Sequence, residues 1–169
     1  MLVAVATAAA LLTCSPALAR STVPSPTAGQ IRAAVRQAER SKHLWTTINI
    51  CNTARYPLTL GIRGQMPALG FRASLYMDVR ALYWSDSRFI AVPTAATLID
   101  LGPQTTGLRQ GGVSFGFAPG AGKLSAAITF IWKRDGKVLA QTSRPATQGH
   151  PDADYGSPAH HSSARCDIS

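Results

Sequence analysis

The sequence predicts an all-β fold: an antiparallel β-sandwich of the immunoglobulin-like kind with a short N-terminal helix, or, as the alternative, a small β-barrel. From position 44 onward, short runs of β-favouring residues alternate with period two and are separated by turn residues. Helical periodicity is confined to one short segment ahead of them. About seven or eight strands at such spacing, with little helix, are typical of a sandwich.

The longest alternating run, at positions 71–84, indicates a half-buried strand with one wet side. Its buried face is expected to carry Leu75, Met77, Val79, Ala81 and Tyr83, and its wet face Tyr76, Asp78, Arg80 and Leu82. Asp135-Gly136, between two later runs, predicts a tight hairpin. The other strands are expected at 44–51, 58–62, 89–92, 97–101, 113–117, 126–133 and 138–142.

The first run, 44–51, has two faces. One is expected to carry Trp45, Thr47, Asn49 and Cys51, and the other Leu44, Thr46, Ile48 and Ile50. Ahead of this run, helical spacing of apolar residues predicts a short amphipathic helix at 30–40, preceded by a flexible lead-in rich in Ser, Thr and Pro. The chain is thus expected to divide into a lead-in at 20–43 and a sandwich domain at 44–169.

The first residues predict a signal peptide, residues 1–19. The apolar run from Leu2 to Leu12 is shorter than the roughly 20 residues that a membrane-spanning helix needs. It is followed by a small-x-small pattern that predicts a cut after Ala19. The alternative is a lipid anchor on Cys14, but the residues before it match such a site poorly. The protein is therefore expected to be secreted.

Removal of residues 1–19 leaves two cysteines, Cys51 and Cys166, which are expected to pair in an oxidising compartment. The bond would close a loop of about 115 residues, for which chain entropy gives roughly 4 to 5 kcal/mol of stabilisation. It is expected to hold the C-terminal tail, 164–169, against the first strand.

The chain carries a formal net charge of +9, and all its charged residues lie after position 19. Outside a cell, this excess favours anionic neighbours such as phospholipid headgroups, wall polymers and acidic polysaccharides. The arginines are spread along the sequence rather than clustered, so no specific nucleic-acid binding is expected.

One pattern suggests a serine hydrolase. Ser114 stands in a G-x-S-x-G motif, and Asp152 or Asp154 and His160 or His161 follow in the order of a hydrolase triad. The motif requires a strand before the serine and a helix after it. Ser114 lies inside an alternating run that is followed by Pro and Gly, so a solvent-facing strand serine is favoured over a nucleophile.

Metal-ligand residue types gather near the C-terminus, at His150, Asp152, Asp154, His160 and His161. Two histidines and two carboxylates could hold Zn²⁺ or Ca²⁺. The spacing belongs to no recognised site, however, so a polar loop is favoured. No motif in the chain indicates a cofactor.

The candidate binding residues are Arg63 and Met66, in the segment GIRGQMP at 61–67. Two glycines around an arginine suggest a shaped turn that presents the guanidinium beside the apolar Met66. The more ordinary interpretation, a bulge or strand crossover with Arg63 in solvent, is favoured.

Several strings resemble a group of uncharacterised secreted proteins of actinobacteria. They are Leu44-Trp45-x-Thr47-x-Asn49-x-Cys51-Asn52-Thr53, the 61–67 segment, Tyr76-Met77-x-Val79-Arg80, Phe130-x-Trp132, Thr147-x-Gly149-His150 and Ser163-Ala164-x-Cys166-x-Ile168. The resemblance covers most of 44–168. It implies secretion and a shared β domain in which both cysteines match, and it implies no activity.

These observations favour a secreted, non-enzymatic domain that binds a protein partner or an anionic surface of the cell envelope. One alternative is a small serine hydrolase that uses Ser114 with His150, His160 or His161. A further alternative is a metal-binding extracellular protein.

Overall fold

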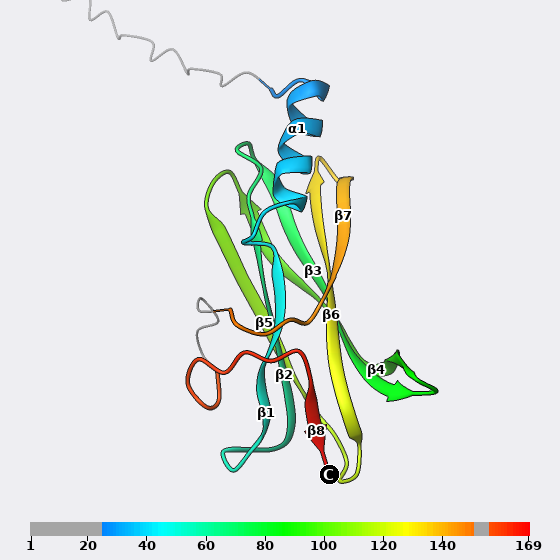
Figure 1. Ribbon diagram of the computed structural model, residues 1–169. Helices are drawn as coiled ribbons and strands as arrows, with labels where there is room; N and C mark the ends of the chain where they lie inside the picture. The colour runs from blue at the N-terminus through cyan, green and yellow to red at the C-terminus, as the bar shows by residue number, and fades with distance from the viewer. Residues whose placement is uncertain (1–24, 151–155) are drawn as a thin grey trace, which may run out of the picture.

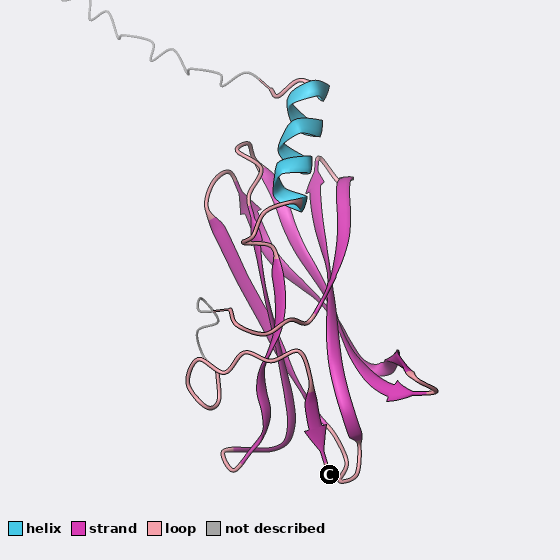
Figure 2. Cartoon of the chain, in the orientation of Figure 1, coloured by secondary structure: helices cyan, strands magenta, loops and turns pink. Residues whose placement is uncertain are grey.

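The computed structural model describes residues 25–150 and 156–169, which form one helix and eight strands (Figure 1, Figure 2). The expected signal peptide, the cut after Ala19 and the alternative lipid site at Cys14 lie outside the described residues. The elements are α1 (Ala28–Glu39), β1 (Trp45–Thr53), β2 (Tyr56–Pro67), β3 (Ala73–Ser85), β4 (Arg88–Gln104), β5 (Leu108–Gly116), β6 (Gly122–Arg134), β7 (Lys137–Pro145) and β8 (Cys166–Ile168).

The strands form two antiparallel sheets that pack face to face. Sheet A has the order β1-β2-β5, and sheet B has the order β4-β3-β6-β7, with β8 paired to the start of β6. The two sheets do not close on each other (Figure 2). The predicted all-β sandwich is therefore confirmed, and the small barrel was the wrong alternative.

The hydrophobic core lies between the sheets and comes mainly from β2, β3 and β6. The large side chains that these three strands bury fully include Leu60, Ile62, Met66, Leu75, Met77, Val79, Ile128, Phe130 and Trp132. Burial of one such side chain stabilises the fold by about 1.5 to 3 kcal/mol. The alternation expected along β3 is confirmed as far as Ala81, whereas Tyr83 is 38% exposed because the strand has by then left the core.

A β-bulge in β1 changes the predicted orientations of Ile50, which pairs with Gly61 rather than sharing the face of Ile48, and of Cys51. Ile48 pairs with Ile62 and Cys51 pairs with Leu60, and both partners point into the core. Cross-strand partners share a face, so Ile48 and Cys51 point the same way although three positions separate them. The assignment of Cys51 to the face of Trp45 was therefore wrong, because the register shift between Ile48 and Ile50 turns it inward.

The inward turn brings Cys51 to Cys166, and the predicted disulfide is confirmed, with the two Cα atoms 5.4 Å apart. Cys51 belongs to sheet A, while Cys166 begins β8, which pairs with β6 in sheet B. The bond therefore joins the two sheets as well as holding the C-terminal tail to the first strand. Its presence is compatible with an extracellular location.

The segment after β7 covers the outer edge of β1 (Figure 1). Thr147 N donates to Thr46 O at 2.9 Å, Ser157 N donates to the carbonyl of residue 49 at 2.8 Å, and Ile48 and Ser163 exchange two backbone hydrogen bonds. An edge strand covered in this way does not offer its backbone to other chains. The cover also explains why β1 is buried on both faces over 45–50.

The predicted helix is confirmed, but it begins two residues earlier than expected because Thr27 caps it. The Thr27 Oγ1 accepts from Gln30 N at 3.3 Å, and the Gln30 Oε1 accepts from Thr27 N at 2.8 Å. Ala38 is buried against the sandwich. No helix in the described part of the chain is long and apolar enough to span a membrane.

Two tight hairpins carry paired left-handed residues. Asp135 and Gly136, at φ 49° and 76°, confirm the hairpin expected between β6 and β7. Asp86 and Ser87, at φ 48° and 66°, make a similar turn between β3 and β4 that the sequence did not predict. The runs expected at 89–92 and 97–101 form one strand, β4, whose register with β3 shifts beside Pro93.

Candidate functional site

The clearest functional feature of the surface is a row of arginines along α1. Arg32, Arg36 and Arg40 are exposed and recur every four residues, which places them on one side of the helix at a rise of about 6 Å from each to the next. The apolar side of α1 packs against the sandwich through Ala34 and Ala38. The arginine row therefore faces solvent.

Cations from sheet B join this row at the same end of the molecule. The Arg144 Nη2 on β7 donates to the carbonyl of Glu39 at 2.6 Å and so ties β7 to the C-terminus of α1. Lys137 lines a hollow with Ile31 of the helix. We call this region the basic end; it comprises Arg32, Arg36, Arg40, Arg72, Lys133, Arg134, Lys137 and Arg144.

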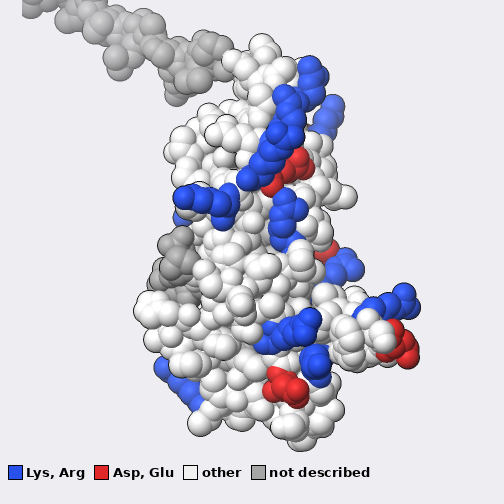
Figure 3. All heavy atoms as spheres, viewed as in Figure 1, with Lys and Arg blue, Asp and Glu red and all other residues white. Residues whose placement is uncertain are grey.

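Carboxylates are few at the basic end. Its elements carry Glu39, on α1, and Asp135, whose Oδ2 lies 3.5 Å from the Arg134 Nε. Figure 3 shows Lys and Arg atoms following the helix, with an acidic patch beside the lower part of the row. Six of the arginines that are spread along the sequence thus lie at the same end of the molecule: Arg32, Arg36, Arg40, Arg72, Arg134 and Arg144. The sequence signal that could have found part of this site is the four-residue spacing within the helix.

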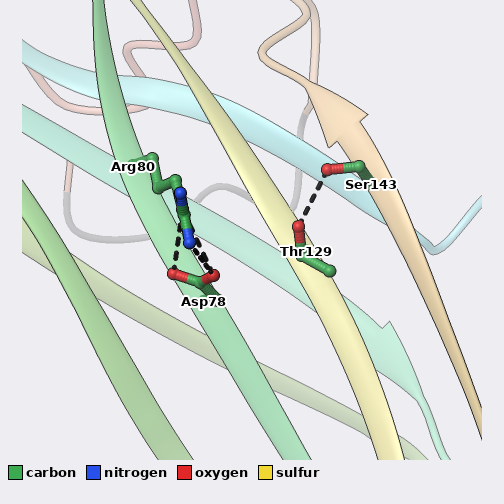
Figure 4. A network of polar contacts seen from close by, with 4 residues as sticks. All are labelled: Asp78, Arg80, Thr129 and Ser143. Atoms are coloured by element: carbon green, nitrogen blue, oxygen red, sulfur yellow. Dashed lines mark hydrogen bonds and ion pairs between the residues drawn. The ribbon is translucent and has the colours of Figure 1, made fainter. Parts of the chain in front are cut away.

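On the outer face of sheet B, a cation is paired with a carboxylate. Arg80 donates to both oxygens of Asp78, with Nη2 at 2.8 Å from Oδ2, and Thr129 and Ser143 are hydrogen bonded at 2.9 Å between their hydroxyls (Figure 4). The hydrogen bonds that Arg80 donates to Asp78, and then the negative charge of Asp78, raise the pKa of Arg80 above its already high ordinary value. The polar groups of this face are thus engaged with one another.

The segment 61–67 is part of β2 rather than a shaped turn, so the turn interpretation was wrong. Met66 is fully buried in the core and cannot contact a ligand at the surface. The glycines serve close packing: a Cβ on Gly64 would lie 2.6 Å from Cδ1 of Ile128, and one on Gly61 would lie 2.7 Å from a side-chain carbon of residue 50.

Arg63 is half-buried on the outer face of sheet A, in a chain of polar contacts. Its Nη1 lies 3.5 Å from the Gln110 Oε1, the Gln110 Nε2 donates to the Gln65 Oε1 at 3.0 Å, and Gln65 in turn donates to the His43 carbonyl. The hollow beside Arg63 has a volume of about 250 Å³. Ligand pockets usually exceed about 300 Å³, so this hollow is small for a ligand site.

The predicted metal ligands are only partly described. Asp152 and Asp154 lie outside the described residues. His150 stacks on Trp45, with ring centroids 4.7 Å apart, and its Nε2 lies 2.6 Å from the Thr147 Oγ1. Neither residues 25–150 nor 156–169 contain a group of three or more His, Cys, Asp and Glu placed to hold a metal ion. The remaining histidines, His160 and His161, lie on the segment that covers β1.

Ser114 is exposed in the middle of β5, opposite Gly61 of β2. The strand continues to Gly116 and is followed by a turn into β6, so the described residues 117–121 form no helix after the serine. The elbow geometry is therefore missing at Ser114. The favoured interpretation, a solvent-facing strand serine, is confirmed.

Away from the basic end, a projecting hairpin carries the exposed aromatic residues Tyr83 and Trp84. The ends of β3 and β4 turn away from the sandwich (Figure 1). There Tyr83 is 38% and Trp84 44% exposed, and the Trp84 ring packs edge-on against Phe89 at 4.9 Å. The Lys123 Nζ lies 5.8 Å from the Trp84 ring.

Compared with family models, curated proteins and solved structures, the chain matches none of them. What this protein does must therefore be inferred from its own residues.

Proposed function

We propose that this protein is a secreted, non-enzymatic domain that binds an extended anionic polymer of the cell envelope through its basic end. The observation that carries the proposal is the exposed row of Arg32, Arg36 and Arg40 on α1. Each pair of like charges four residues apart destabilises a helix by about 0.2 to 0.5 kcal/mol. The row weakens the helix it stands on, and a polyanion along it would reverse that effect.

The shape of the basic end favours a polymer over a compact ligand. The arginine row is linear, and Lys137 and Arg144 of β7 lie beside it. An extended chain of phosphates or carboxylates can contact such a row at several points and release its counterions. Because Val35 and Ala38 on the apolar side of α1 pack against the sandwich, the helix does not present a free apolar face for insertion into a bilayer.

The location outside the cell has two supports. The residues that precede the described part of the chain have the pattern of a signal peptide. The disulfide between Cys51 and Cys166 suits an oxidising compartment. Envelope polymers that carry phosphate or carboxylate groups would then be neighbours of the protein.

The proposal is tested with long-chain inorganic polyphosphate as the probe. We expect fluorescence anisotropy to show binding at low salt that weakens steeply between about 50 and 200 mM salt. Replacement of three arginines, Arg32→Gln, Arg36→Gln and Arg40→Gln, should reduce the slope of log K against log salt by roughly 2, since each contact contributes about 0.7.

The matched control carries Arg55→Gln, Arg88→Gln and Arg165→Gln, which remove the same charge from exposed sites away from the basic end. The control should keep most of the affinity. Equal losses in the two variants would show that only net charge matters and would overturn the proposal. Tight binding to phosphatidylglycerol vesicles without binding to polyphosphate would also overturn it, in favour of a lipid surface.

A further inference from the structure

A hollow lies between the N-terminal turn of α1 and the loops at the adjacent end of the sandwich. Its volume is about 600 Å³, which is within the range of small-molecule pockets, about 300 to 1,000 Å³. It is lined by Ser25, Pro26, Gln30, Ala34, Leu69, Gly70, Phe71, Arg72, Thr105 and Arg134. The hollow thus collects residues from the helix, from the loop before β3 and from the ends of β4 and β6.

The lining has two kinds of surface. Leu69, Phe71 and Ala34 give it an apolar wall, and this wall is continuous with the core, since all three pack against core residues. Arg72 and Arg134 supply two positive charges, and none of the lining residues is acidic. An apolar wall with cations at its border fits a ligand that is itself apolar at one end and anionic at the other.

The two arginines are held differently. Arg134 is positioned: its Nη2 donates to the Ser25 Oγ at 3.3 Å, its Cζ lies 5.7 Å from the centre of the Phe71 ring, and its Nε lies 3.5 Å from the Asp135 Oδ2. A guanidinium has five N–H donors, so these contacts leave Arg134 able to donate to a ligand. Arg72 is exposed and lines both this hollow and a smaller one that Arg134 also lines.

The helix adds to the positive potential. The hollow includes Gln30, in the first turn of α1, where the backbone N–H groups of a helix concentrate partial positive charge. The side chain of Thr27 satisfies the N–H of Gln30. An anion near this turn would therefore face both guanidinium groups and the positive end of a helix.

We propose that this hollow binds an apolar chain that ends in one anionic group, with the chain against Leu69 and Phe71 and the anion between Arg72 and Arg134. A carboxylate and a phosphate monoester share this chemistry. The site does not depend on the polymer-binding function proposed above, because the row of Arg32, Arg36 and Arg40 does not line it.

The experiment measures binding of dodecanoate and of dodecyl phosphate to the purified protein by isothermal titration calorimetry, below their micelle concentrations. The neutral methyl dodecanoate should bind at least about tenfold more weakly than dodecanoate, because it offers no charge to the arginines. Comparison of the two anions distinguishes a fatty-acid source from a lipid phosphate. Equal binding of the ester, or no binding of either anion, would overturn the proposal.

Variants locate the binding. Arg72→Gln, at an exposed side chain, should weaken dodecanoate binding by about tenfold. Thr105→Trp, at the exposed rim, should fill the hollow and abolish binding, whereas Thr94→Trp, on β4 away from the hollow, should not. Unchanged affinity in Thr105→Trp would place the ligand elsewhere and overturn the assignment. The Arg32, Arg36, Arg40 triple variant should keep full affinity for dodecanoate, so the two proposals fail separately.

Discussion

The two ends of the sandwich differ in how they are held and in how their charges are balanced. At the end where β8 lies, a disulfide joins the sheets, and Lys123 is the register partner of Asp167 across β6 and β8. At the basic end, a twelve-residue helix docks through small residues, and cations greatly outnumber carboxylates. The covalently held end thus carries less net positive charge than the lightly held end. This contrast suggests that the basic end is the one adapted to a partner.

The largest effect should come from removal of the disulfide at the end where β8 lies. The double variant Cys51→Ala, Cys166→Ala should lose roughly 2 to 5 kcal/mol of unfolding free energy, measured by urea denaturation. Polyphosphate affinity of the folded protein should stay unchanged, because the basic end lies at the opposite end of β1. A parallel loss of affinity would show that the two ends are coupled and would break the comparison.

A smaller effect should come from the cap of the helix. Thr27→Ala should destabilise α1 by about 1 kcal/mol, and faster amide hydrogen exchange should follow in the helix but not in β3 or β6. Since the arginine row depends on the helix, polyphosphate binding should weaken. Thr106→Ala, another exposed threonine, serves as the control and should change neither quantity. Unaltered amide hydrogen exchange in Thr27→Ala would show that the packing of α1 against the sandwich, and not its cap, stabilises the helix.

The smallest effect is expected at the projecting hairpin. Trp84→Ala should change stability by no more than about 0.5 kcal/mol and leave polyphosphate binding intact. The variant should also lose the tryptophan fluorescence that acrylamide quenches. The other two tryptophans, Trp45 and Trp132, are only 4% and 0% exposed, so acrylamide cannot reach them. If binding to polyphosphate also falls, the hairpin belongs to the binding surface, and the distinction between the two ends is wrong.

The parts of the fold that depend on local sequence patterns could be predicted from the sequence. The alternation of β3 places Met77 and Val79 in the core without reference to any other strand, and Asp135-Gly136 favours the hairpin conformation by itself. The bulge before Ile50 could not be found in this way, because one extra residue leaves both flanking runs alternating. It therefore reversed the predicted orientation of Cys51.

The parts that depend on contacts between distant segments were missed. The segment that covers β1 has no periodicity, since its backbone pairs with Thr46 and Ile48 through isolated hydrogen bonds rather than as a strand. The basic end was missed for a similar reason. Lys137 and Arg36 are far apart in sequence, and only the docking of α1 beside β7, fixed by Arg144, brings them to the same end.

The sheet that contains β1 cannot finish folding until the segment that covers β1 has been synthesised. β1 is among the first strands to be synthesised, but the groups that satisfy its outer edge come from residues 147, 157 and 163, near the end of the chain. Contacts between segments so far apart form slowly, because a long loop must close first. Until the last residues have emerged from the ribosome, this edge stays open to pairing with other chains, and Cys51 has no intended partner. A chain shortened at its C-terminus would therefore be expected to associate with its neighbours rather than fold.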